Sequence, residues 1–188
     1  MNNKYLIIEI ATKLLSEYGT AQFSAHQIAN TSRLTLREVT AQFPNKTEII
    51  DLCLQNAVEC MTRTVISANY ARGYNSVLDL WHLLVQYNFV HVAEGKLISL
   101  YLRSPSQFPY VNIKSSLLRM LNEKTELLHD KFFDSCEAIR LIALSYLIQM
   151  AAVYTLSHEA EGSRELRENY FVSHVKSHFE SLLILPIY

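Results

Sequence analysis

A short stretch near the N-terminus carries hydroxyl and cationic side chains, which can donate hydrogen bonds. Ser24 and Thr35 carry hydroxyl groups, and Arg37 and Lys46 carry positive charges. Hydroxyl, guanidinium and ammonium groups donate hydrogen bonds to phosphate oxygens, and an arginine can also pair with guanine through two hydrogen bonds. These side chains can act together only if local structure presents them on one surface.

Three helix starts follow one another closely in this part of the chain. Each has an N-cap residue and, three positions later, a Glu or Gln, so that the two side chains can satisfy backbone amides of the first turn reciprocally. Such capping boxes in succession predict short helices separated by tight turns. The three boxes are Ser24–Gln27, Thr35–Glu38 and Asn45–Glu48.

The first two boxes predict a helix-turn-helix. They leave room for a helix over about 25–31, a turn at 32–34 and a second helix over about 36–42. Two short helices joined in this way form a helix-turn-helix, whose second helix enters the major groove of DNA. A helical corner with no role in DNA binding would carry the same caps, so the caps alone leave both interpretations open.

The other elements are predicted from apolar residues at helical spacing. The four glycines and four prolines fall where that spacing stops or changes, and no sustained alternation of period two predicts a strand. The fold class is therefore all-α. The expected helices, about nine in number, cover about 3–18, 25–31, 36–42, 46–71, 74–93, 96–103, 110–131, 134–158 and 164–184.

The stretch from Ile10 to Ile50 resembles the DNA-binding domain of the TetR family of transcriptional regulators. Its segment ATKLLSEYGTAQFSAHQIANTS is similar to the family's first helix, glycine and second helix. Its segment VTAQFPNKTEII is similar to the tyrosine-phenylalanine-lysine segment that follows in the family. The resemblance implies a helix-turn-helix domain over 1–50 and a larger helical domain over 51–188, with the boundary inside the long fourth helix.

The resemblance also implies which side chains contact DNA. By position, Ser24 and Lys46 would bind phosphates, Lys46 at the start of a helix where backbone amides also point outward. Arg37 is the best candidate for reading a base. The full set of expected DNA-binding residues is Ser24, Thr35, Leu36, Arg37, Thr40 and Lys46.

Three positions depart from the family's pattern. The glycine usual in the turn is Arg33 here, and the usual pair of tyrosines is replaced by Thr40 and Gln42. Loss of the two phenols removes a phosphate donor and some packing. These departures keep open a second interpretation, a TetR-like protein that binds DNA weakly and acts through a protein partner.

Bulky aromatic and imidazole side chains are concentrated in the middle of the chain. Such groups form ordinary helical cores, and they also line apolar cavities that bind small molecules. The resemblance implies an effector site here, which we expect to be an elongated apolar cavity for a mostly apolar or aromatic molecule. The residues expected to line it are Met61, Trp81, His82, Tyr87, Tyr101, Tyr110 and His129.

The last two helices are expected to join two copies of the chain. Their apolar faces are too wide for one neighbouring helix to cover, and small residues on the first of them would permit close approach. The resemblance implies a four-helix bundle formed with a second copy, hence a homodimer. The expected interface residues are Ile142, Tyr146, Met150, Val153, Val175 and Phe179.

Composition narrows the class of protein. Hydrophobic residues make up 49% of the 188, which suffices for a buried core, and the net charge of -1 gives no strong sign of nucleic acid. No signal peptide is convincing, and the uncharged stretch 141–156 is shorter than the ~20 residues that a bilayer needs. We therefore expect a cytoplasmic protein without membrane contact.

Neither catalysis nor metal binding is indicated. Cys53, Cys60 and Cys136 lack C-x-x-C spacing, which favours buried thiols over a zinc site or disulfides. His174 and His178 have a spacing that can hold zinc, yet no Cys or carboxylate supports them on that helix. The sequence has no nucleophile elbow and no phosphate loop, so we expect that the protein is not an enzyme and needs no cofactor. A helical enzyme would need a defined catalytic pair.

Overall fold

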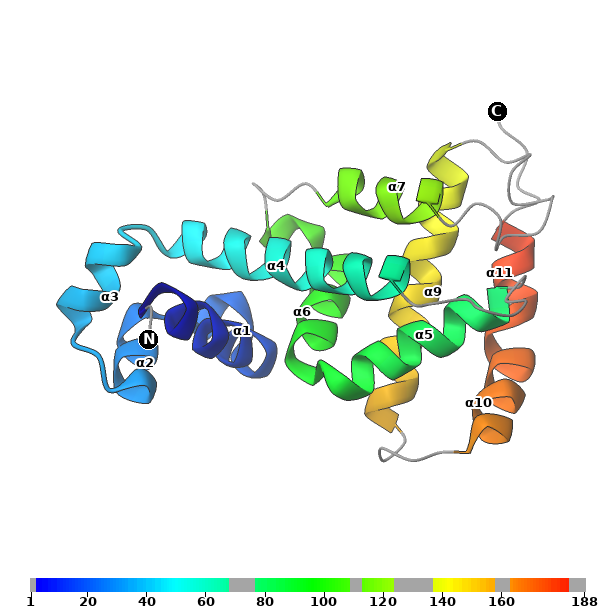
Figure 1. Ribbon diagram of the computed structural model, residues 1–188, viewed down its shortest axis with the longest axis horizontal. Helices are drawn as coiled ribbons and strands as arrows, with labels where there is room; N and C mark the ends of the chain where they lie inside the picture. The colour runs from blue at the N-terminus through cyan, green and yellow to red at the C-terminus, as the bar shows by residue number, and fades with distance from the viewer. Residues whose placement is uncertain (1–2, 68–76, 109–112, 124–136, 158–162, 183–188) are drawn as a thin grey trace. The chain divides into compact units, whose positions relative to one another are not determined.

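The computed structural model describes residues 3–67, 77–108, 113–123, 137–157 and 163–182. Every regular element within these ranges is helical, so the all-α class is confirmed (Figure 1). The elements are α1(Asn3–Gln22), α2(Ala25–Ser32), α3(Leu36–Gln42), α4(Lys46–Ser67), α5(Val77–Val90), α6(Val92–Arg103), the 3₁₀ turn η1(Pro105–Gln107), α7(Lys114–Glu123), α9(Glu137–Ser157), α10(Arg164–Tyr170), the π-helical segment η3(Phe171–Lys176) and α11(Ser177–Leu182).

The expected helix over 164–184 differs most from the structure. It consists of α10, η3 and α11, because a π-helical segment interrupts the α-helical hydrogen bonding between Phe171 and Lys176. A π-helix bonds each amide one residue further back than an α-helix does, and nothing in a pattern of apolar residues signals the change. The helices around the predicted helix-turn-helix, by contrast, begin where their caps place them.

Gly19 interrupts α1 with a conformation that other residues rarely adopt. Its backbone has φ 70° and ψ 178°, a region open essentially to glycine alone. An added Cβ would meet no atom within 4 Å, so the requirement is conformational rather than one of space. The regular part of α1 therefore ends at Tyr18, as the glycine predicted.

We expect Gly19→Ala to lower the free energy of unfolding by about 1–3 kcal/mol, the cost of forcing a non-glycine residue into this region. Urea denaturation of the full chain measures the effect. The control is Glu17→Ala, an exposed position within the regular helix, where a change within about 0.5 kcal/mol is expected. Equal denaturation midpoints for the two variants would contradict this account of Gly19.

The described helices form two compact units. The first contains α1, α2, α3, the start of α4 as far as Glu59, α6 and η1. The second contains the rest of α4 from Cys60, with α5, α7 and the helices from α9 onward. This division describes packing; the functional division expected at residue 50 remains a prediction.

The core of the first unit supports the predicted helix-turn-helix. Helix α1 packs against α2 and α6, and α2 packs against α3. Three of the apolar residues that flank the two capping boxes, Phe23, Ile28 and Val39, are buried, and the fourth, Leu34, is half-buried. Burial of these side chains fixes the angle at which the chain enters each short helix. Other buried residues of this core are Ile7, Ala11, Leu15, Phe43, Ile49 and Leu54.

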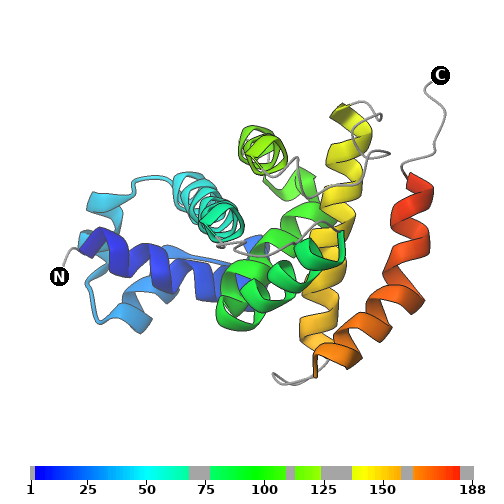
Figure 2. The ribbon, with the colours of Figure 1, turned by 45° about the vertical axis from the view of Figure 1, so that its right-hand side comes forward.

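The second unit is built around α9. Helix α5 packs along α9, and α7 and α11 pack against it as well; Figure 2 shows α9 (yellow) and α10–α11 (orange to red) next to each other. The segment Ile139–Ser157 is long and apolar enough to cross a membrane by length and composition alone. Because α9 contacts three other helices, its apolar side chains can pack in the core of this unit.

Candidate nucleic-acid interface

The first capping box is complete and begins α2. The amide of Gln27 donates to Ser24 Oγ over 3.3 Å, and the amide of Ser24 donates to Gln27 Oε1 over 2.8 Å. The predicted box at Ser24 is therefore confirmed. It satisfies two of the amides that the first turn of a helix leaves unpaired.

The second capping box is also complete and begins α3. The amide of Glu38 donates to Thr35 Oγ1 over 3.2 Å, and the amide of Thr35 donates to Glu38 Oε2 over 2.7 Å. Hydrogen bonds from the backbone and the hydroxyl of Thr35 lower the pKa of Glu38. The carboxylate is thus held against its own helix start, as the box predicted, although its side chain is exposed.

The third cap differs from the predicted box. Asn45 Oδ1 accepts a hydrogen bond from the amide of Thr47 over 2.9 Å, two residues along the chain rather than three. This is an Asx turn, which Asn forms readily because its short side chain reaches the second amide after it. The helix start at Lys46 was right, and the reciprocal bonding with Glu48 was wrong.

The turn between α2 and α3 is held by a serine. Ser32 Oγ donates to the carbonyl of Ala29 over 3.3 Å and accepts from the amide of Leu34 over 3.2 Å. Between them, Arg33 has φ 62° and ψ 17°, the left-handed conformation that commonly ends a helix. The predicted turn at 32–34 is therefore confirmed, with an arginine in the left-handed position.

The hydroxyl groups expected to contact DNA donate within the chain. Ser24 Oγ donates to Gln27 Oε1 over 3.2 Å, and Thr35 Oγ1 donates to Glu38 Oε2 over 2.7 Å. Thr40 Oγ1 donates to the carbonyl of Leu36 over 3.0 Å. Phosphate oxygens are acceptors, so each hydroxyl would have to give up an internal bond to bind one.

The basic side chains expected to contact DNA, unlike these hydroxyl groups, are not engaged within the chain. The side chains of Arg37 and Lys46 are exposed, and neither makes a hydrogen bond or ion pair with the described residues. Lys46 Nζ lies 6.0 Å from the centroid of the buried Phe23 ring, at the edge of cation–π range. Leu36 is 36% exposed and could contact a thymine methyl group.

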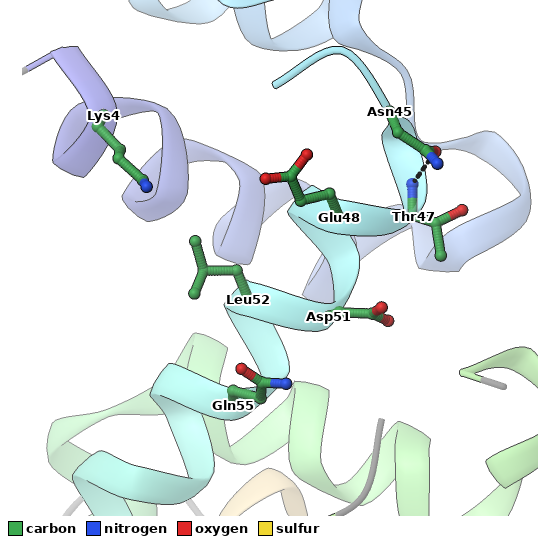
Figure 3. Close-up of a pocket in the computed structure, with 7 residues that line it drawn as sticks. All are labelled: Lys4, Asn45, Thr47, Glu48, Asp51, Leu52 and Gln55. Atoms are coloured by element: carbon green, nitrogen blue, oxygen red, sulfur yellow. Dashed lines mark hydrogen bonds between the residues drawn. The ribbon is translucent and has the colours of Figure 1, made fainter. Parts of the chain in front are cut away.

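A polar hollow lies between the start of α1 and the first half of α4 in this unit. It encloses ≈ 520 Å³ and is open to solvent, and Figure 3 shows Lys4 and Glu48 extending toward one another across it. Burial raises the pKa of Asp51, one of its lining residues. Charges of both signs do not suit an apolar effector. The lining residues are Lys4, Asn45, Thr47, Glu48, Asp51, Leu52 and Gln55.

The residues expected to bind an effector divide between the units. Met61, Trp81 and Tyr87 are buried in the second unit. His82 is there too, with Nε2 3.4 Å from Glu168 Oε1, where it links α5 to α10. Tyr101 belongs to the first unit and packs edge-on against Phe108. Tyr110 and His129 lie outside the described residues.

An aromatic cluster surrounds Trp81 in the second unit. The indole ring is stacked on Tyr170 with centroids 6.1 Å apart, and Tyr154 and Phe171 approach it at 5.9 and 5.6 Å. Its Nε1 is buried and has no hydrogen-bond partner among the described residues. The sequence analysis did not include Tyr154 and Phe171 among the expected effector-binding residues, although their spacing from other apolar residues placed them in helices.

The residues expected at a dimer interface also divide. Ile142 is 54% exposed and Val153 is 36% exposed, and Tyr146 and Met150 are half-buried. Val175 and Phe179 are buried within the single chain. The interface stays a prediction, in which the exposed side chains of α9 would make the contact with a second copy.

Of the two cysteines that the structure describes, Cys53 is buried as expected and Cys60 is half-buried. Cys53 is buried, with Sγ 3.6 Å from the carbonyl oxygen of Ile8, and burial raises its pKa to about 12. A thiol with so high a pKa is inert at neutral pH. Cys60 is half-buried and free, and Cys136 lies outside the described ranges. Over those ranges no three His, Cys, Asp or Glu side chains gather as metal ligands would.

Comparison with solved structures shows which fold this is. No family model and no curated protein matches the chain. A protein from Shewanella sp. PV-4 assigned to the TetR family of transcription regulators is 15% identical with a TM-score of 0.67, and 97% of this chain and 96% of that one are covered.

Two further structures support the same assignment of fold. The multidrug binding protein EbrR, complexed with imidazole, is 16% identical with a TM-score of 0.54, over 100% of this chain and 98% of that one. A gamma-butyrolactone receptor is 16% identical with a TM-score of 0.53, over 96% and 93% of the two chains. The chain therefore has the fold of TetR-family regulators over nearly its whole length.

Proposed function

We propose that this chain, which has the fold of the TetR-family regulators, is a DNA-binding transcription regulator. The observation that carries the proposal is the helix-turn-helix of α2 and α3, with two complete capping boxes. Arg37 is exposed on α3 and Lys46 is exposed at the start of the following helix, α4, and neither forms an ion pair with a described residue. A rigid helix corner that presents free cations suits the major groove and flanking phosphates.

The two cations have separate roles in this proposal. Arg37 lies in the first turn of α3, the helix that would enter the major groove, and its planar guanidinium suits a guanine edge. Lys46 is the first residue of α4, where an ammonium group would bind a phosphate near outward-pointing amides. Leu36 would add apolar contact with a thymine.

The second unit would sense a small molecule. Its aromatic cluster, with a Trp81 Nε1 that has no hydrogen-bond partner among the described residues, suits an apolar or aromatic effector that carries one hydrogen-bond acceptor. EbrR, which has this fold, binds imidazole, a small aromatic molecule. Effector binding would change the separation of the two recognition helices in a homodimer, with a coupling free energy of about 1–3 kcal/mol. The protein would then act as a cytoplasmic repressor that its effector releases.

The dimer would form through one face of α9. Ile142, Tyr146, Val153 and Leu156 recur at helical spacing, and three of them are among the most exposed apolar side chains of the described residues. No charged residue interrupts this face between Arg140 and the end of the helix. A two-fold interface must be self-complementary, and an uncharged apolar face meets that requirement.

We expect Arg37→Ala and Lys46→Ala to weaken DNA binding in different ways. Loss of a two-bond base contact costs about 1–3 kcal/mol on the cognate site and relaxes preference at one base. Loss of a phosphate contact weakens binding on every sequence and lowers the slope of affinity against salt by about 1. Fluorescence anisotropy with DNA from upstream of the gene and with a scrambled duplex measures both quantities.

Lys13→Gln is the matched control for loss of charge. Lys13 lies on α1, where its Nζ pairs with Glu9 Oε1 at 2.8 Å, and we expect its loss to leave both affinities within twofold. If neither Arg37→Ala nor Lys46→Ala changes binding relative to this control, the assignment of base reader and phosphate contact is wrong.

A further inference from the structure

Arg33 holds a conformation that its residue type disfavours. Its φ of 62° is the one positive φ at a non-glycine residue in the described part of the chain. The left-handed region brings Cβ close to the following carbonyl oxygen, and only glycine enters it without strain. Glycine at this position would form the same turn at lower cost, so the turn itself does not explain the arginine.

The surrounding structure holds Arg33 firmly in this conformation. Ser32 Oγ bridges the turn on both sides of it, by bonds of 3.3 Å to Ala29 and 3.2 Å to Leu34. Capping boxes fix the start of the helix before it and the helix after it. Strain persists at one residue only where neighbours determine its conformation, and such strain often marks a functional position.

The Arg33 side chain has no role inside the described structure. It is exposed, and with the described residues it makes neither a hydrogen bond nor an ion pair. The neighbouring carboxylate, Glu38, is bonded to Thr35 instead. A free guanidinium thus lies on a rigid turn, two residues before the N-cap of the helix that presents Arg37.

We propose that Arg33 binds a phosphate of the DNA backbone and so positions α3 in the major groove. The inference rests on the proposed function. A phosphate suits this position because Arg33 precedes the helix that would enter the groove, and therefore lies outside it, where the sugar-phosphate backbone runs. Arginine binds phosphate through two parallel hydrogen bonds, which fix orientation as well as supply charge.

A phosphate contact from Arg33 would compensate for hydroxyl groups of the helix-turn-helix that are not available to bind phosphate. The hydroxyls of Ser24, Thr35 and Thr40 all donate to groups within the chain. Phosphate binding here therefore depends on cations, and Arg33 supplies a second one beside Lys46, because Arg37 is assigned to a base. Strain in the free protein is then the cost of holding a guanidinium in place before DNA arrives.

Two substitutions separate the strain at Arg33 from its charge. Arg33→Gly removes both, so we expect the melting temperature to rise by about 2–4 °C. Arg33→Ala removes the charge but keeps the left-handed strain, and we expect no such rise. Both variants should lower affinity for cognate and scrambled duplexes alike. The slope of log affinity against log salt should fall by about 1 per subunit, and the loss of affinity should be roughly eightfold per contact at about 0.1 M salt.

The full-length wild type, the two variants and Lys13→Gln are compared on the same duplexes across a range of salt. Equal slopes for wild type and Arg33→Gly, with wild type bound, overturn the phosphate contact and leave the proposed function standing. An equal loss of slope in Lys13→Gln overturns it too, because any positive charge would then serve. Absence of DNA binding by the wild type overturns the proposed function and this inference together.

Discussion

Replacing Trp81 by alanine is expected to lower the free energy of unfolding by about 3–5 kcal/mol, the largest loss from one side chain in the second unit. Trp81 has no exposed surface and touches aromatic rings from α9, α10 and η3. Its removal leaves a cavity where the helices of this unit meet. Urea denaturation monitored by circular dichroism of the full chain measures the loss.

Trp81→Phe is the informative companion. Phenylalanine keeps most of the stacking with Tyr170 and removes the buried Nε1–H, which has no partner among the described residues. An unpaired buried donor costs about 1–3 kcal/mol, so its removal offsets part of the lost volume. We expect Trp81→Phe to cost less than half of what Trp81→Ala costs. Equal costs would show that the indole N–H has a partner after all.

Introducing aspartate at Val153 is expected to break the dimer. Two-fold symmetry would place the change on both sides of the interface, and an unpaired buried charge costs about 2–5 kcal/mol, which is at least a 30-fold rise in the dissociation constant. Sedimentation equilibrium over a concentration series measures the rise. The same substitution at Ile142, near the other end of the exposed face, should act alike.

Ser163→Asp is the matched control for the dimer. Ser163 is exposed and caps α10 by accepting from the amide of Leu166 over 3.2 Å. Aspartate caps a helix as well as serine does, so this variant adds the same charge without loss of the cap. A wild type that sediments as a monomer at micromolar concentration contradicts the interface. So does equal weakening by Ser163→Asp and Val153→Asp.

Local rules predicted the helix boundaries of the helix-turn-helix well, because the caps that set these boundaries are local interactions. The boxes at Ser24 and Thr35 depend on residues three positions apart, and the turn at Arg33 depends on its immediate neighbours. Asn45 marks the limit of that reasoning. Its side chain could satisfy either of two amides, and only the backbone geometry before α4 decided in favour of Thr47.

Tertiary packing decided what the sequence left open. Val175 and Phe179 have the same apolar character as Ile142 and Val153, but packing against the chain's own core buries the first pair and leaves the second pair exposed. Periodicity shows that a helix has an apolar face and does not show what covers it. The cluster around Trp81 likewise joins residues far apart in sequence, so no local pattern could assemble it.

The most direct test of DNA reading is selection of bound sequences from a random duplex library by the wild-type protein, with Arg37→Ala in parallel. The account predicts a two-fold symmetric sequence with half-sites separated by a multiple of about 10 base pairs, and loss of preference at one base of each half-site in the variant. A wild type that enriches no sequence at low salt would contradict it. A TetR-like protein that acts through a protein partner would then be the better interpretation.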